Sequence, residues 1–449
     1  MRKTFSALNT GRLQRWGRHL ALGLTLGLVT LLSSCTYGAN GIFYSLEHVT
    51  KIANGNGFGS NSKYISINSV VEYPVSGTSY YLATGGADLF WEKPGSDLWQ
   101  NVGTLPGVHV ASVGELPGVG NSNAPSGATP TLYAVSGDDN GNSALYYTQG
   151  DFHSGSWQKI SFPAGLTPVN LVPVLDWNAH FPVAYLVNTQ NSTLDYQNVF
   201  LLTPSNPTTL TQPSPTQGYS LVTNNATRFY DTNLGESSPT LGSPVIAASV
   251  DGSSLTSATT LYVLNTGFLW TASLSGGSLA SSAPFYLVSG LPGGNGPYGA
   301  MAYIAAPEAS LTSSGVLLGS SDNSLNGGNL WQGTVSGTGT AGATWTTLNQ
   351  LASNARNSYS YIFDFNTIAY KNNKTLFIGS VRSGMGQIYG GTFAGPPNSN
   401  TVDTNSWASS LLEQYGIQSF FLGSDGEYFL GTYGFGLWVQ ASDNTFSLQ

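Results

Sequence analysis

The chain has 449 residues, of which only 8% are charged, whereas 56 are glycine and 12% are aromatic. This composition is typical of a rigid, turn-rich β protein and excludes extended disorder, which goes with few aromatic residues and high charge. A single cysteine, Cys35, excludes an internal disulfide and a cysteine zinc site, so the size of the core must supply the stability.

The first 34 residues have the charge order of an export signal. Five basic residues and no acidic residue precede an apolar run over 20–32. This run is short for a bilayer span, which needs about 20 residues. We therefore predict a signal peptide over 1–34. The alternatives are an ordinary signal peptide that ends near a cysteine, and an uncleaved membrane anchor.

The leader ends in Leu32-Ser33-Ser34-Cys35, which resembles the lipobox of bacterial lipoproteins. The resemblance implies cleavage between Ser34 and Cys35, a thioether-linked diacylglycerol on Cys35 and acylation of the new amino terminus. Two or three acyl chains hold a protein stably, because each buried methylene contributes about 0.8 kcal/mol. Thr36 stands where an aspartate would resemble the inner-membrane retention signal of enteric bacteria. The resemblance therefore favours an outer-membrane anchor in the cell envelope.

Removal of the leader leaves nine basic and twenty-two acidic residues, a net charge of −13. Such a surface repels phosphate backbones and anionic headgroups, so we expect no nucleic-acid partner and no electrostatic docking to a membrane. Attachment to the membrane is then expected through lipid alone. The sequence favours no particular oligomeric state.

One phrase recurs along the body of the chain: a β-rich run, a glycine-containing turn, and an aliphatic residue followed by an aromatic one. The pairs are Leu89-Phe90, Leu145-Tyr146, Val199-Phe200, Leu269-Trp270, Leu330-Trp331, Ile388-Tyr389 and Leu437-Trp438. An apolar strand is predicted before each pair, over 65–71, 108–113, 169–175, 245–250, 300–305, 362–369 and 417–422. Trp-led segments at Trp99, Trp157, Trp345 and Trp407 follow several copies.

These seven copies, 49 to 70 residues apart, predict an all-β fold of four-stranded antiparallel blades. A seven-bladed β-propeller over 35–449 is the expected architecture, with the aliphatic-aromatic pairs in the core between blades. An eighth pair, Ile42-Phe43, has no partner strands before it. We expect Gly41–Leu46 to add a strand to the C-terminal blade and close the ring, with eight blades as the alternative.

Two resemblances accompany this plan. Gly342-Ala343-Thr344-Trp345 is similar to the tail of the Asp-box of sialidase-type propellers, although the Ser-x-Asp head is missing upstream. The blade plan also resembles the outer-membrane assembly propeller with pyrroloquinoline-quinone-type repeats, which is a lipoprotein. Neither resemblance carries a motif of a known activity. A polar stretch of about 204–244 interrupts the rhythm and is expected to be a surface loop.

Acidic residues follow the first strand of most repeats and form the candidate site. They are Glu72, Glu115, Asp176, Asp251, Glu308 and Asp425. Equivalent turns of a propeller surround one mouth of its channel, so the pattern predicts an acidic rim that attracts a cation such as Ca²⁺ or a basic partner segment. The alternative is that Asp and Glu simply suit solvated turns.

The other titratable residues show no catalytic or metal-ligand spacing. His48, His109, His153 and His180 are dispersed and are expected to be turn or surface residues. Asp138-Asp139-Asn140-Gly141-Asn142 resembles a calcium loop in composition but lacks the later glutamate, so a hairpin turn is expected. No cofactor and no metal site are predicted.

Two functions follow from these observations. The first is a lipid-anchored binding or scaffolding module for a protein or glycan partner, which is not an enzyme. The alternative is a propeller-type glycoside hydrolase that acts on envelope or host glycans, since two carboxylates suffice for that chemistry. The absence of a recognisable triad, metal cluster or arginine clamp favours the first.

Overall fold

The computed structural model describes residues 66–85, 88–96, 98–138, 142–190, 196–211, 244–265, 269–279, 286–288, 298–305, 315–321, 329–335, 343–349, 365–372, 375–380, 385–389, 392–394, 416–432, 434, 436–440 and 446–448. The chain divides into two compact units, Met1–Gly55 and Asn56–Gln449, and all described residues belong to the second. Cys35 and the predicted closing strand over 41–46 lie outside the described residues. Among the described residues, no helix has the length and apolar character of a membrane span.

Five four-stranded sheets account for most of the described chain. The first contains β1 (Ile67–Val75), β2 (Thr78–Gly85), β3 (Asp88–Glu92) and β4 (Gln100–Asn101). The second contains β5 (His109–Leu116), β6 (Thr131–Gly137), β7 (Ser143–Thr148) and β8 (Gln158–Ile160), with the 3₁₀ turn η1 (Phe152–Ser154) before β8. The other three contain β18 (Tyr298–Ile304), β19 (Val316–Ser321), β20 (Asn329–Val335) and β21 (Ala343–Asn349); β22 (Phe365–Asn372), β23 (Thr375–Ser380), β24 (Met385–Tyr389) and β25 (Thr392–Ala394); and β26 (Ile417–Leu422), β27 (Tyr428–Thr432), β28 (Leu437–Gln440) and β29 (Phe446–Leu448).

A nine-stranded sheet lies between the second and third of these in the chain. Its strands are β9 (Thr167–Leu175), β10 (Pro182–Gln190), β11 (Tyr196–Thr203), β12 (Asn206–Thr211), β13 (Val245–Val250), β14 (Thr260–Asn265), β15 (Leu269–Ser275), β16 (Ser278–Leu279) and β17 (Tyr286–Leu287). The two halves, β9–β12 and β13–β17, join through a short parallel pairing of Ala248 with Val174 and Ser249 with Leu175. All paired strands within each half are antiparallel, with both β16 and β17 pairing with β15.

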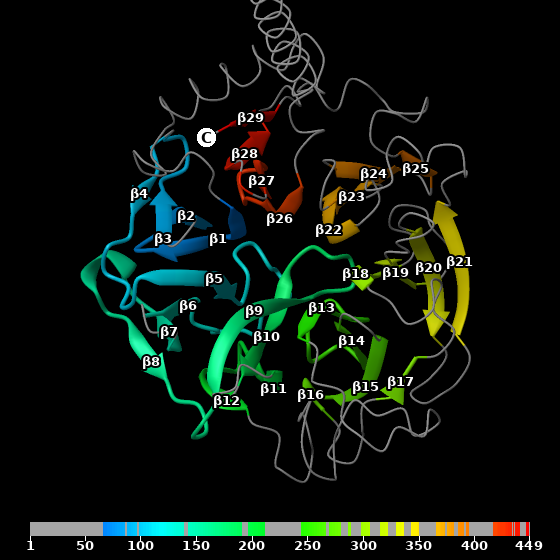
Figure 1. Cartoon of the computed structure of the whole chain (residues 1–449), viewed down its shortest axis with the longest axis horizontal. Helices are drawn as coiled ribbons and strands as arrows, with labels where there is room; N and C mark the ends of the chain where they lie inside the picture. Colours follow the sequence, from blue (N-terminus) through cyan, green and yellow to red (C-terminus); the bar gives the residue numbers. More distant parts are fainter. Residues whose placement is uncertain are drawn as a thin grey trace, which may run out of the picture. The chain divides into compact units, whose positions relative to one another are not determined.

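The first strands of the sheets form a closed ring (Figure 1). β1 contacts β5, β5 contacts β9, and the series continues through β13, β18, β22 and β26, which contacts β1 again. An ordered ring of four-stranded antiparallel sheets is a β-propeller. The predicted all-β fold with such blades is therefore confirmed.

The recurring sequence phrase corresponds to the middle of each blade. All seven aliphatic-aromatic pairs lie in strands, from Leu89-Phe90 in β3 to Leu437-Trp438 in β28. Trp270 and Trp331 are at most 2% exposed. Around Trp270 the two halves of the nine-stranded sheet pack together, and around Trp331 that sheet packs against the sheet of β18–β21. The prediction that these pairs form core between blades is confirmed for the described members.

Serine side chains connect the first strands of neighbouring sheets. In three places a serine hydroxyl oxygen accepts a hydrogen bond of 2.9 Å from a backbone N–H of the next first strand, and in a fourth place the serine donates to a backbone carbonyl. The pairs are Ser69 with Val113, Ser112 with Leu171, Ser249 with Tyr303, and Ser419 with Ile67 at 3.1 Å. These bonds satisfy backbone groups on the inner edges of the sheets, which the sheet ladders leave unpaired.

The polar stretch predicted as a loop over 204–244 begins differently. Residues 206–211 form β12, the edge strand of its half-sheet. An edge strand tolerates Pro207, which cannot donate to a ladder. Residues 212–243 lie outside the described part of the chain.

Candidate functional site

The antiparallel order of each blade sends two of its connections to the same edge. The connection from the first to the second strand and that from the third to the fourth strand emerge together. We call the surface that they form the loop face. Its described connections include 93–96, 117–130, 149–157, 176–181, 251–259 and 423–427.

The five described members of the predicted acidic rim lie at the loop face, but three of them are buried. Glu72 lies within β1 and Glu115 within β5, and they are 2% and 3% exposed. Asp176 directly follows β9 and is 4% exposed. The alternative of solvated turns does not describe these three carboxylates, because strand ladders and packed connections, rather than water, surround them.

Glu72 joins the first sheet to the last. Its Oε2 accepts a hydrogen bond of 2.8 Å from the backbone N–H of Ser424, and its Oε1 accepts one of 2.6 Å from the Ser424 hydroxyl. Ser424 lies in the turn between β26 and β27. This carboxylate thus fastens the ring at the point where its two ends meet.

Glu115 is buried with only part of its hydrogen-bonding capacity used. Its Oε2 accepts from the backbone N–H of Val119 at 3.0 Å, and no described residue donates to its buried Oε1. Burial raises the pKa of Glu115 to about 8; the N–H groups of Val119 and Gly118 lower it in part, and the charge of Glu72 raises it. The carboxyl group is therefore predominantly protonated at neutral pH.

Asp176 builds the turn over 176–181. Its Oδ1 accepts hydrogen bonds from the backbone N–H groups of Asn178, His180 and Phe181. Burial raises the pKa of Asp176 to about 6, and the three N–H groups limit that rise. Burial also lowers the pKa of His180 to about 4, so this histidine is neutral at pH 7.

The remaining rim members are placed differently. Asp251 is half-buried and accepts from Thr259 and Thr260, whereas Asp425 is exposed in the turn after β26; Glu308 lies outside the described residues. Within the described ranges, no three His, Cys, Asp or Glu side chains come together to hold a metal ion. Attraction of a cation or a basic segment by the rim stays a prediction.

A second group of titratable and aromatic side chains gathers where the connection between β7 and β8 meets β2 and β3. We call Tyr80, Trp91, Asp151, Phe152 and His153 the histidine junction. Asp151 caps η1: its Oδ1 accepts from the backbone N–H of His153 at 2.9 Å and lies 2.6 Å from His153 Nδ1. The N–H and ring of His153 lower the pKa of Asp151. The side chain of His153 is 32% exposed and that of Asp151 48%.

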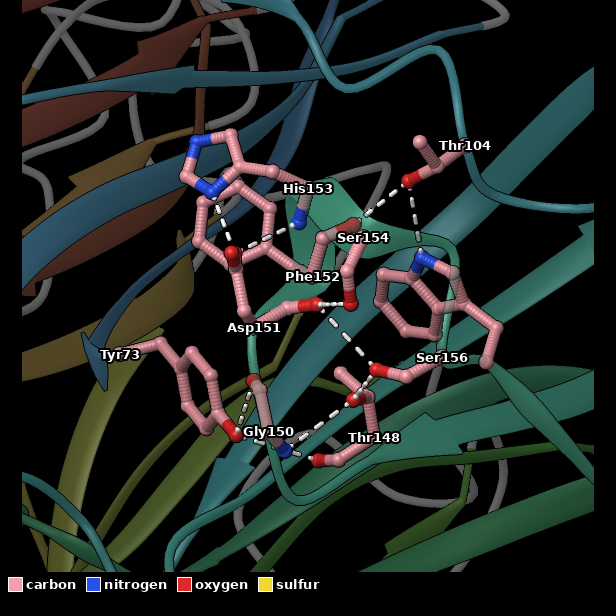
Figure 2. A network of polar contacts seen from close by, with 10 residues as sticks. Tyr73, Thr104, Thr148, Gly150, Asp151, Phe152, His153, Ser154 and Ser156 are labelled. Carbon is pink, nitrogen blue, oxygen red and sulfur yellow. Dashed lines mark hydrogen bonds and ion pairs between the residues drawn. The ribbon is translucent and has the colours of Figure 1, made fainter. Parts of the chain in front are cut away.

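Hydrogen bonds from neighbouring elements fix this connection (Figure 2). The Tyr73 hydroxyl, from β1, lies 3.1 Å from the carbonyl oxygen of Gly150. Thr104 donates its hydroxyl to the carbonyl oxygen of Phe152 at 2.6 Å and accepts from Trp157 Nε1 at 3.3 Å. The histidine is thus presented on a backbone that two sheets hold in place.

The rings of the histidine junction come from both sheets. The His153 ring stacks on Phe152, with centroids 3.9 Å apart, and meets the edge or face of Trp91 at 4.5 Å and of Tyr80 at 5.4 Å. Phe152 is fully buried, whereas Tyr80, Trp91 and His153 are partly exposed. The exposed surface therefore combines three aromatic rings with one carboxylate.

The hydroxyl groups nearest the His153–Asp151 pair form hydrogen bonds to the backbone. A His–Asp pair activates a nucleophile only when a hydroxyl or thiol lies within hydrogen-bond reach of the other ring nitrogen. No described residue hydrogen-bonds to His153 Nε2, and the nearby Ser154 and Ser156 hydroxyls donate to the carbonyl oxygen of Asp151. Partly exposed rings beside a polar group are typical of ligand and protein recognition sites.

The sequence did not reveal the histidine junction. His153 was expected to be an isolated turn or surface residue, because its ring partners Tyr80 and Trp91 belong to another repeat. The local phrase Asp151-Phe152-His153-Ser154-Gly155 does contain a signal, namely a capping aspartate followed by a glycine that adopts φ 74°. His109 is exposed at the start of β5, and His48 lies outside the described residues.

Comparisons with known proteins give structural similarity only. No known protein-family profile matches the sequence, and no curated protein is significantly similar to it. The chain is similar to YCF48 from Cyanidioschyzon merolae, with 10% identity, 83% of this chain and 95% of that one covered, and a TM-score of 0.47. It is also similar to the extracellular domain of the putative hybrid two component system BT3049 from B. thetaiotaomicron, with 11% identity, 85% of this chain and 40% of that one covered, and a TM-score of 0.46. Both are β-propeller proteins, but the assignment of the fold to this chain rests on its own strand order.

Proposed function

We propose that this chain is a lipid-anchored, seven-bladed β-propeller of a bacterial cell envelope that binds a protein or glycan partner through its loop face. The blade count treats each half of the nine-stranded sheet as one blade. In support, each half has its own first strand in the ring and its own aliphatic-aromatic pair, in β11 and β15.

The proposed anchor rests on the sequence of the leader. The charge order of 1–34 and the Leu-Ser-Ser-Cys ending support export and lipid attachment at Cys35. The chain without its leader has a net charge of −13, which opposes electrostatic docking to anionic lipids. It contains no other thiol, so lipid attachment is the evident use of this cysteine. An outer-membrane position follows from Thr36.

The histidine junction is the observation that carries the binding role. Its histidine ring and carboxylate lie on a connection that hydrogen bonds hold in place, and its other exposed rings come from β2 and β3. Side chains held in this way lose little conformational entropy when a partner binds. Aromatic residues in such settings are the usual source of binding energy in interfaces.

A capture experiment tests this function. The full-length chain with a C-terminal affinity tag is incubated with solubilised envelope, and retained proteins and glycans are identified for wild type, for a His153→Ala/Trp91→Ala variant, and for His109→Ala. His109 is a matched control because it is an exposed histidine at the start of β5, opposite the loop face. We expect wild type and His109→Ala to retain the same partner and the junction variant to lose at least about tenfold. Equal retention by all three would contradict a binding role for the junction.

A further inference from the structure

An exposed tryptophan is held rigidly in the turn over 176–181. The backbone N–H of Trp177 donates to the carbonyl oxygen of Gly252 at 3.0 Å, and its carbonyl oxygen accepts from the N–H of Ala305 at 2.6 Å. Asp176 fixes the same turn from within. The turn that follows β9 is therefore tied to the ends of β13 and β18.

The side chain of Trp177 has no comparable restraint. It is 41% exposed, and no described residue accepts a hydrogen bond from its indole Nε1. An indole on a rigid backbone offers an apolar face and one free donor at low cost in conformational entropy.

Serine hydroxyl groups lie in the connection that holds the backbone of this tryptophan. Ser253 and Ser254, both partly exposed, directly follow Gly252, the backbone partner of Trp177, and Ser254 Oγ lies 3.0 Å from Oγ of the exposed Ser257. Asn178 directly follows Trp177 in the chain, and its Oδ1 accepts a hydrogen bond of 3.2 Å from the N–H of Ala305. We call Trp177, Asn178, Ser253, Ser254 and Ser257 the Trp177 platform.

The two connections that form the Trp177 platform, 176–181 and 251–259, contain no lysine or arginine. Asp176 is buried and accepts three N–H groups, while both carboxylate oxygens of Asp251 accept hydrogen bonds from Thr259. An anionic ligand therefore finds no positive counter-charge in these two connections, whereas a neutral ligand rich in hydroxyl groups finds hydrogen-bonding partners that match its own.

We infer that the Trp177 platform binds a neutral saccharide. The negative face of the indole attracts the polarised C–H groups on the apolar face of a pyranose ring. The serine hydroxyls and the Asn178 amide can then exchange hydrogen bonds with the sugar hydroxyls at the edge of that ring. This inference rests on the proposed binding role of the loop face and names a glycan as a ligand of that face.

Saccharide titration tests the inference. The full-length chain is purified in a detergent without a sugar headgroup and titrated calorimetrically with cellohexaose, chitohexaose, maltohexaose and, as a charged control, hexagalacturonate. We expect at least one neutral hexasaccharide to bind, and hexagalacturonate to bind at least about tenfold more weakly. Trp177→Ala is expected to lower the association constant for the neutral ligand by about tenfold or more, and Trp177→Phe by less, because a smaller ring remains.

Leu98→Ala is the matched control, because Leu98 is another exposed apolar residue of the loop face, at 54% exposure. It should bind as wild type does, and unchanged thermal melting should show that every variant is folded. Absence of binding by all neutral hexasaccharides, or binding that Trp177→Ala leaves unchanged, would overturn the inference. If no saccharide binds but the envelope capture still depends on His153, the inference fails and the proposed function stands. If Trp177→Ala abolishes the capture of a protein, the inference also fails, and the platform is a protein-binding surface.

Discussion

Burial changes what the acidic side chains can do. Glu115 is a carboxylic acid at a position of its repeat similar to those of the other rim residues, yet its side chain is almost completely buried. Its charged form is destabilised by burial, so its pKa rises to about 8. Charge read from the sequence therefore overstates the negative potential at this part of the loop face.

The stability of the fold should depend on the protonation of Glu115. Because the folded pKa of about 8 exceeds the ordinary value of 4.5, the folded state binds the proton more tightly, and the free energy of unfolding falls as pH rises between these values. Glu115→Gln mimics the protonated group. It should therefore remove the decrease in the free energy of unfolding that the ionisation of Glu115 causes, which is on the order of a few kcal/mol. Urea denaturation of both proteins at pH 5 and pH 9 measures the difference.

Asp176→Asn serves as a comparison, because the folded pKa of Asp176 is about 6. The effect of its ionisation on the free energy of unfolding is therefore complete by neutral pH. Its pH-dependent difference from wild type should arise below pH 7. Parallel pH profiles for wild type and Glu115→Gln would contradict the raised pKa of Glu115.

At the scale of the elements, sequence patterns predicted strands well and tertiary partners poorly. The predicted strands over 245–250 and 417–422 coincide with β13 and β26, because these short runs are rich in the aliphatic and aromatic residues that fit a pleated, packed surface. β12 was missed, since Pro207 and its threonine-rich surroundings are typical of a loop. The burial of Glu72 could not be predicted, because its partner Ser424 is 352 residues away in the chain.

The contacts between first strands leave no room for extra atoms at Gly431. A Cβ there would overlap the Ser419 hydroxyl and the carbonyl oxygen of Ile67, which form one of the serine connections between sheets. Gly431→Ala should therefore lower the free energy of unfolding by about 1–3 kcal/mol. Chemical denaturation measures this change.

Gly150→Ala provides the comparison, since the nearest atom to its added Cβ, Ser156 Oγ, is 3.8 Å away. Its effect should stay within about 0.5 kcal/mol. Similar losses in both variants would mean that backbone flexibility, and not the contact between sheets, determines the cost at Gly431.

At the scale of the whole molecule, the leader and the propeller have separate roles. The propeller presents the loop face, and the lipid that we propose at Cys35 would attach the chain to a membrane. Cells grown with a labelled fatty acid should incorporate the label into the wild-type chain and not into Cys35→Ser, because serine has no thiol to form the thioether. Equal labelling of both chains would exclude Cys35 as the site of the lipid.

The fastening of Glu72 to Ser424 also has a consequence for the order of folding. Each blade forms from strands that are near in sequence, whereas the bonds at this seam close a loop of 352 residues. The length-dependent entropy of such a closure is roughly 5 kcal/mol, which only a nearly complete set of blades can offset. The seam should therefore form last during folding and open first under destabilising conditions. Amide exchange would then be faster at the N–H of Ser424 than in the first strands of the sheets. The ring would open reversibly at this seam while the individual blades stay folded.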